Sequence, residues 1–78
     1  MENKIINLVE LAANELNISA EMLTLNNKFR ELPNWSSLNA LLFVAKINEE
    51  TGILISSADL ADMITLSDIH HYLIKKLA

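Results

Sequence analysis

A chain of 78 residues suffices for one small domain and is too short for a deep catalytic cleft, so we expect residues 1–78 to form a single domain. Ten acidic residues against six Lys and Arg give a net charge of −4, which argues against nucleic-acid binding because neutralising phosphates needs clustered basic side chains. The chain has no cysteine, which excludes disulfides and thiolate zinc sites, and its single Gly and single Pro favour helices over turn-rich β structure.

The first residues lack the basic segment and apolar run that mark a secretion signal. No apolar stretch is long enough to span a bilayer. We therefore expect a cytoplasmic protein that does not insert into membranes.

The first predicted element is an amphipathic helix over residues 2–16. Its apolar residues recur at helical spacing and are Ile5, Leu8, Val9, Ala12 and Leu16. Ser19 follows as the cap of a short turn, and a long connection then leads to Pro33. Because burial must hold so long a loop in a small domain, we expect its apolar residues to pack inward, namely Leu23, Leu25, Phe29 and Leu32.

A helix break and a new helix start are predicted at Pro33, which has no backbone donor and disfavours helical geometry before it. Ser36 is a suitable N-cap for a helix over residues 37–51, and Gly52 can end it in the left-handed conformation. Ser37 then occupies the first helical position. Free backbone N–H groups and the positive end of the helix dipole make that position suitable for a phosphate.

This second helix contains more apolar residues than one core-facing side needs. Four follow the i, i+3, i+4, i+7 spacing and are expected in the core: Ala40, Phe43, Val44 and Ile47. Four more remain: Leu38, Leu41, Leu42 and Ala45. Two interpretations of this second group stay open, namely burial of a second face in a small bundle or a partner-binding surface beside Ser37.

The β-branched run at residues 53–55 has no second strand to pair with and is interpreted as a buried loop crossing. Ser56 or Ser57 then caps a short third helix that ends near Asp62. Thr65 and Asp68 predict the capped start of a last helix. Its inner face is expected to comprise Leu66, Ile69, Tyr72, Leu73 and Leu77. The predicted fold is all-α, with four helices, the third of them short.

Signatures of catalysis or metal binding are weak. His70 and His71 are adjacent on a helix and point about 100° apart. No cysteine or third histidine completes a site with them, so we assign no metal. A serine enzyme needs a base oriented by a third group and an oxyanion hole, and no Gly-x-Ser-x-Gly turn surrounds Ser37, so we do not expect an enzyme.

The stretch Trp35-Ser36-Ser37-Leu38, opening an apolar helix in mid-chain, resembles the attachment motif of acyl carrier proteins. That family usually has Asp-Ser-Leu, often preceded by Trp, so Ser36 here replaces a charged residue with a neutral cap. The resemblance covers nearly the whole chain and includes Phe29 and Leu32, the helix end Glu49-Glu50-Thr51-Gly52, the run 53–55, and Thr65-Leu66-Ser67-Asp68-Ile69.

The resemblance implies a monomeric four-helix bundle of the acyl carrier protein type with a long loop between the first two helices. It implies that Ser37 carries 4′-phosphopantetheine through a phosphodiester, attached from coenzyme A by a phosphopantetheinyl transferase. The arm would hold an acyl group as a thioester for enzymes of fatty acid, polyketide or other specialised biosynthesis. Two alternatives stay open: an aminoacyl or peptidyl carrier, and an unmodified helical interaction module.

The family's second helix is typically acidic and is its main recognition surface. Here only Glu49 and Glu50 are acidic in that helix. We therefore expect docking to depend less on charge than in common members of the family.

Overall fold

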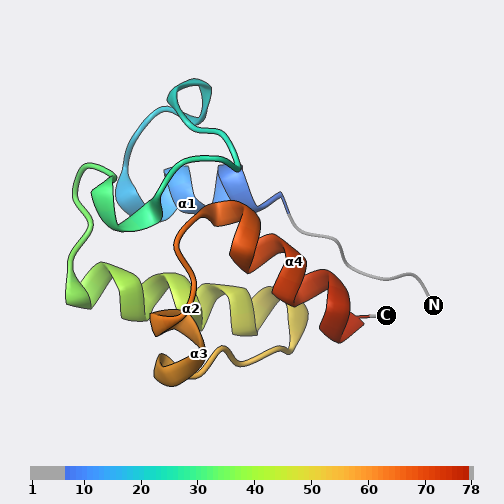
Figure 1. The fold of residues 1–78 in the computed structure, drawn as a ribbon. Helices are drawn as coiled ribbons and strands as arrows, with labels where there is room; N and C mark the ends of the chain where they lie inside the picture. The colour runs from blue at the N-terminus through green and yellow to red at the C-terminus, as the bar shows by residue number, and fades with distance from the viewer. Residues whose placement is uncertain (1–6, 78) are drawn as a thin grey trace.

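The computed structural model describes residues 7–77, which form an all-α bundle (Figure 1). The elements in chain order are α1 (Leu8–Leu16), the short 3₁₀ helices η1 (Ala20–Met22) and η2 (Phe29–Glu31), α2 (Ser37–Thr51), α3 (Ser57–Ala61) and α4 (Leu66–Leu77). The predicted fold class, the short third helix and the long connection between the first two helices are confirmed. The predicted bounds of α2 are also correct.

The start of α1 differs from the prediction. Asn7 is not helical but caps the helix, since its side-chain oxygen accepts a hydrogen bond from the Glu10 backbone N–H at 3.1 Å. Short polar side chains such as Asn compete for backbone donors and so favour caps over helix interiors. The predicted helical residues 2–6, with Ile5, lie outside the described residues. At its other end α1 stops at Asn17, which is left-handed at φ 57°.

The connection between α1 and α2 is fastened to the start of α4. Lys28 and Thr65 form an isolated antiparallel bridge. Beside it, the Phe29 N–H donates to the Ile64 carbonyl at 3.1 Å. Inward packing of the connection is confirmed, with Leu23 and Phe29 buried and Leu25 and Leu32 partly buried.

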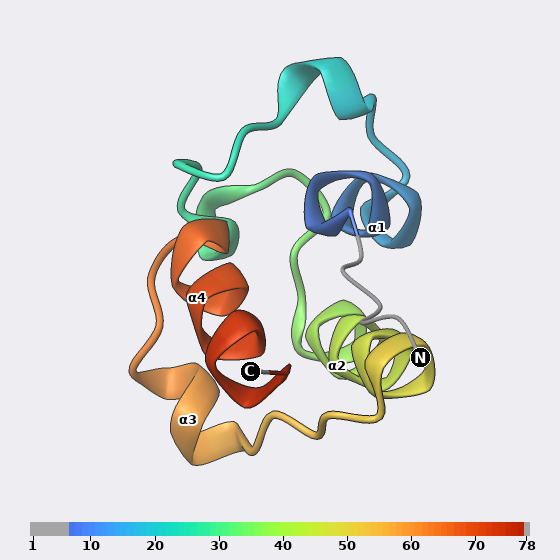
Figure 2. The same ribbon diagram turned by 90° about the vertical axis from the view of Figure 1, so that its right-hand side faces the viewer.

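The core lies between α1, α2 and α4 (Figure 2). Its helical members are Leu8, Ala12, Ala13, Phe43, Val44, Ile47, Leu66, Ile69 and Leu73. The predicted inner faces of α2 and α4 are therefore correct, with Ala40, Tyr72 and Leu77 only partly buried. Phe29, which is fully buried, joins this core from the connection.

The segment between α2 and α3 follows the prediction only in part. Ile55 is buried and Ile53 is partly buried, but the side chain between them, Leu54, is 69% exposed. The prediction of a buried crossing is wrong for Leu54, because the flanking side chains face the core and this one points away. Of the two candidate caps of α3, Ser56 is the one used, since its Oγ accepts from the Asp59 N–H at 3.0 Å.

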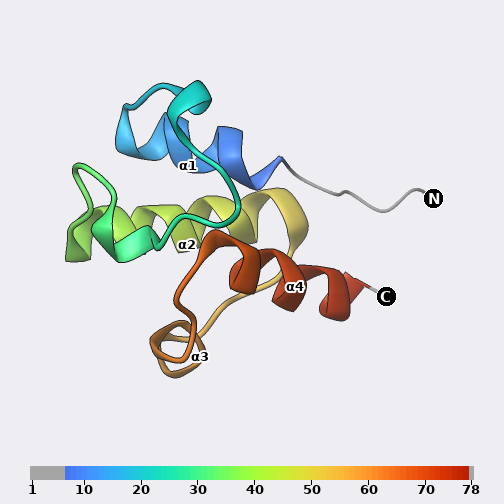
Figure 3. The same cartoon turned by 45° about the horizontal axis from the view of Figure 1, so that its top comes forward.

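α3 lies on the opposite side of α2 and α4 from α1 (Figure 3). After it, α4 begins with the predicted reciprocal caps. The Thr65 Oγ1 accepts from the Asp68 N–H at 3.2 Å, and the Asp68 carboxylate accepts from the Thr65 N–H at 3.1 Å. A further backbone donor, the Ile64 N–H, lies 2.8 Å from the same carboxylate. These backbone donors lower the pKa of Asp68, because they stabilise its charged form.

Candidate functional site

The first turn of α2 presents two neighbouring hydroxyls in different settings. Ser36 is extended at φ −150° and its Oγ accepts a hydrogen bond from the Asn39 N–H at 3.1 Å, so it caps the helix. Ser37 is the first helical residue and is exposed. The positions predicted for the two serines are confirmed. No acidic residue lies in this first turn, so the backbone donors at the helix start face no competing carboxylate of their own turn.

Asn34 fixes the turn that leads into α2. It is left-handed at φ 67°, and its side-chain amide donates to the Leu16 carbonyl at the end of α1 at 2.8 Å. Its own carbonyl accepts from the Asn39 side chain at 2.7 Å. The helix start that carries Ser37 is thus tied to α1. Sequence reasoning missed Asn34 and Asn39, for which the only signal was the turn-forming character of Asn after Pro33.

Trp35, immediately before the two serines, is half-buried between two core aromatic rings. The centroid of its ring lies 5.1 Å from the ring centroid of Phe29 and 6.1 Å from that of Phe43. The pair with Phe43 is edge-on. Such tilted and edge-on pairs are the favourable geometries for aromatic side chains. Trp35 therefore anchors the turn before α2 to the core.

An apolar hollow of about 260 Å³ opens beside Ser37, between α2 and α3. Ser37, Ala40, Leu41 and Val44 line it from α2, Ile55 from the intervening segment, and Ser57 and Leu60 from α3. No charged side chain contributes to this wall. A second hollow, of about 270 Å³, lies under the α1–α2 connection and includes no residue of α2, so it is not part of the site.

The side of α2 turned away from the core exposes a row of apolar side chains. The exposed fractions are 65% for Leu38, 67% for Leu41 and 45% for Leu42, and Ala45 is also exposed. Of the two interpretations left open by the sequence, burial of a second face is therefore wrong for these four residues. We call Leu38, Leu41, Leu42 and Ala45 the leucine face.

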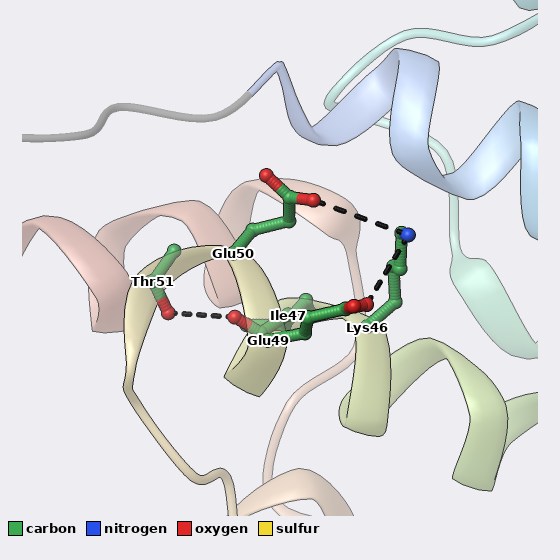
Figure 4. A network of polar contacts seen from close by, with 5 residues as sticks. All are labelled: Lys46, Ile47, Glu49, Glu50 and Thr51. Carbon is green, nitrogen blue, oxygen red and sulfur yellow. Dashed lines mark hydrogen bonds and ion pairs between the residues drawn. The ribbon is translucent and has the colours of Figure 1, made fainter.

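The charged side chains of α2 all lie in its C-terminal half. Figure 4 shows the polar contacts that they make. The Lys46 ammonium lies 3.2 Å from the Glu49 carboxylate and 3.9 Å from that of Glu50. The hydrogen bond that the Lys46 ammonium donates to the Glu49 carboxylate raises the pKa of Lys46, because it stabilises the charged form. Residues 36–45, which include the leucine face, have no charged side chain. The surface next to Ser37 is therefore neutral as well as apolar.

His70 and His71 have rings 6.2 Å apart on α4. Across residues 7–77, no three His, Cys, Asp or Glu side chains gather as a possible metal site. In the same range no helix combines the length and the apolar character needed to cross a membrane.

A family model described as a phosphopantetheine attachment site matches residues 7–73, which include the whole of α1, α2 and α3 and most of α4. The chain belongs to this family. A comparison with curated proteins found no match. Family members carry 4′-phosphopantetheine covalently on a serine and are not catalysts themselves. The protein is therefore a phosphopantetheine carrier rather than an enzyme.

Proposed function

We propose that the protein is an acyl carrier whose 4′-phosphopantetheine is attached to Ser37 and whose cargo is an apolar acyl group. Ser37 is exposed at the first position of α2 and is followed by Leu38, as in the family motif. Ser36 uses its oxygen to cap the helix, whereas the Ser37 hydroxyl makes no hydrogen bond within the described residues. Of the two serines, Ser37 is the one free to accept a modification.

The helix start also suits the phosphate of the arm. The N–H groups of the first turn of a helix lack intrahelical partners, and the helix dipole adds a partial positive charge there. An Asp at position 36 would place a negative charge beside the phosphate, whereas Ser36 supplies the same cap without it. The first turn can therefore hold a phosphodiester without repulsion from its own side chains.

The nature of the cargo is supported by one observation, the apolar hollow beside Ser37. When bound, the arm supplies the thiol that holds the cargo as a thioester. The side chains of Leu41, Val44 and Leu60 can remove the apolar part of an acyl group from water. A charged aminoacyl group would lose hydration there without gaining a partner, so the hollow favours acyl over aminoacyl cargo.

The leucine face is the proposed docking surface for the phosphopantetheinyl transferase and for enzymes that load and remove cargo. Its residues lie on the same helix as Ser37, and exposed apolar patches commonly mark interaction sites. Because residues 36–45 are uncharged, the partner surface is apolar rather than a cluster of Lys and Arg.

These partners belong to fatty acid, polyketide or other specialised biosynthesis in the cytoplasm. The carrier itself is a monomer of one domain.

The deciding experiment is incubation of the chain with coenzyme A and a broad-specificity transferase, followed by intact mass and peptide mapping. We expect one arm, located on Ser37. Ser37→Ala should abolish attachment, and Ser36→Ala, the matched neighbouring change, should retain it. An arm mapped to Ser36 would contradict the proposed site. Failure of every transferase on both the native chain and Ser36→Asp would favour an unmodified interaction module.

A further inference from the structure

α3 forms one wall of the hollow but contributes no fully buried side chain of its own. It has five residues. An isolated helix of that length is not stable by itself, because nucleation costs more than its few hydrogen bonds return. The position of α3, and with it the width of the hollow, must therefore depend on contacts from other elements.

Arg30, in η2, makes the most extensive of these contacts. Its Nη1 donates to the Met63 carbonyl at 2.6 Å and its Nη2 to the Leu60 carbonyl at 2.8 Å. The Leu60 carbonyl lies in the last turn of α3 and also accepts from the Met63 N–H at 3.0 Å, and the Met63 carbonyl lies two residues beyond the helix. A positive charge is favoured at this end of a helix. A planar guanidinium can reach two carbonyls at once, which a Lys ammonium does less well.

The guanidinium is itself held by the core. It lies over the ring of Phe29 at 4.6 Å from the centroid, and Phe29 is fully buried. The backbone of Phe29 is also bonded to Ile64, just beyond α3. Arg30 therefore links the end of α3 to a fixed point rather than to a mobile surface.

A second contact holds the middle of α3. The Tyr72 hydroxyl on α4 donates to the Asp59 carboxylate at 3.0 Å. Leu60, the next residue, combines two roles: its side chain lines the hollow and its carbonyl accepts from Arg30. Without Arg30, α3 keeps the Tyr72 contact and the buried Met63 that follows it, but its C-terminal end loses two hydrogen bonds.

We propose that Arg30 is a positioning residue that holds α3 in place and thereby keeps the hollow beside Ser37 at the size that receives an acyl chain. This inference rests on the proposed cargo. It means that Arg30, in the α1–α2 connection, determines how well the carrier protects an apolar chain.

The test attaches a chain directly, without a transferase. Ser37→Cys introduces the only thiol of the chain. Methyl or octyl methanethiosulfonate converts this thiol into a methyl or octyl disulfide, and methanesulfinate is released. The measured quantity is the difference in thermal midpoint between the octyl and methyl forms. We expect the octyl form of Ser37→Cys to melt about 5 °C or more above the methyl form, because the longer chain buries methylenes in the hollow.

Adding Arg30→Ala should remove at least about half of this octyl increment, and Arg30→Lys should restore part of it. The matched control is Asn17→Ala, which strains the left-handed end of α1 and lowers stability away from the hollow. It should lower both midpoints and leave the increment intact. If Arg30 only stabilised the fold, Arg30→Ala would likewise lower both midpoints and leave the octyl increment intact.

An unchanged octyl increment in Arg30→Ala would overturn the inference. So would the absence of any increment in Ser37→Cys itself, because the hollow would then receive no chain. Neither result bears on attachment of the arm, which is measured by mass on the native chain. Failure of this inference and failure of the attachment site are therefore distinguishable.

Discussion

α2 and α4 bury similar sets of side chains in the same core but differ in what they expose. α2 buries Phe43, Val44 and Ile47, and α4 buries Leu66, Ile69 and Leu73. The outer side of α4 is mainly polar, with Asp68, His71, Lys75 and Lys76 exposed and one large apolar side chain, Ile74, 43% exposed. The outer side of α2 carries the leucine face.

The difference between the outer sides of α2 and α4 distinguishes apolar residues that the core needs from apolar residues that it does not need. α4 shows that three buried residues and a polar exterior suffice for a helix of this core. The three exposed leucines of α2 are therefore in excess of what the core requires, and they lie beside Ser37. Exposed apolar surface reduces solubility, so a row of three exposed leucines on one helix beside Ser37 supports a partner-binding role.

The largest effect is expected at the buried side of α2. Phe43 is 1% exposed, so Phe43→Ala should cost about 3–5 kcal/mol through lost burial and a residual cavity. Leu41→Ala, on the opposite side of the same helix, should cost much less, because Leu41 is 67% exposed. Denaturant unfolding of the two variants measures both costs. Equal costs would remove the distinction between the two sides of α2.

The sequence predicted this distinction because helical periodicity alone divides α2 into two faces. Phe43, Val44 and Ile47 have the spacing of one stripe, and that stripe is buried. What the pattern left open was whether the remaining leucines are covered. Coverage depends on where the other helices lie, which a pattern within one helix does not contain.

The same limit explains the features that the sequence missed. The apolar periodicity predicts an earlier start for α1 than Leu8, because it contains no sign that the Asn7 side chain takes a backbone donor and caps the helix. The hollow needs the position of α3, and α3 is positioned by Arg30 and Tyr72 from distant parts of the chain. Side-chain hydrogen bonds between residues 13 and 33 positions apart leave no local signal in the sequence.

The next effect concerns the start of α2. Ser36→Ala removes the acceptor for the Asn39 N–H and should cost about 0.5–2 kcal/mol while leaving attachment at Ser37 intact. Ser36→Asp should keep the cap and increase the rate of modification by a general transferase, because it restores the charge usual in the family. Thermal melts measure the stability cost of Ser36→Ala, and loading rates measure the effect of Ser36→Asp on modification. A slower rate for Ser36→Asp would show that the neutral cap is preferred by the enzyme.

The start of α4 should respond to acid in a way that the start of α2 does not. The backbone donors hold the pKa of Asp68 below its ordinary value, so this contribution to stability is present above about pH 4 and is lost as the pH falls through the lowered pKa. Asp68→Asn should be less stable than the native chain at neutral pH and approach it below about pH 4. Thermal midpoints across this range test the prediction, which parallel curves for the two proteins would contradict.

The smallest effect on stability, and the one that tests the docking proposal, is expected at the leucine face. Leu42 is 45% exposed and does not line the hollow, so Leu42→Gln separates docking from cargo binding. We expect its free energy of unfolding to change by less than about 1 kcal/mol. Loss of an apolar anchor should nevertheless raise the KM of a cognate loading enzyme about tenfold, with kcat nearly unchanged.

Two controls distinguish apolar docking from charge-driven docking at this face. Lys46→Gln removes a charge at the other half of α2 and should leave KM unchanged, because Lys46 is paired with Glu49 and Glu50. Raising the salt from about 0.1 M to about 1 M shortens the screening length from about 10 Å to about 3 Å and should also leave KM within about twofold. A KM that rises steeply with salt while Leu42→Gln has no effect would assign docking to charges outside the leucine face. A large loss of stability in Leu42→Gln would instead assign Leu42 to the core. The outer side of α2 would then serve folding rather than docking.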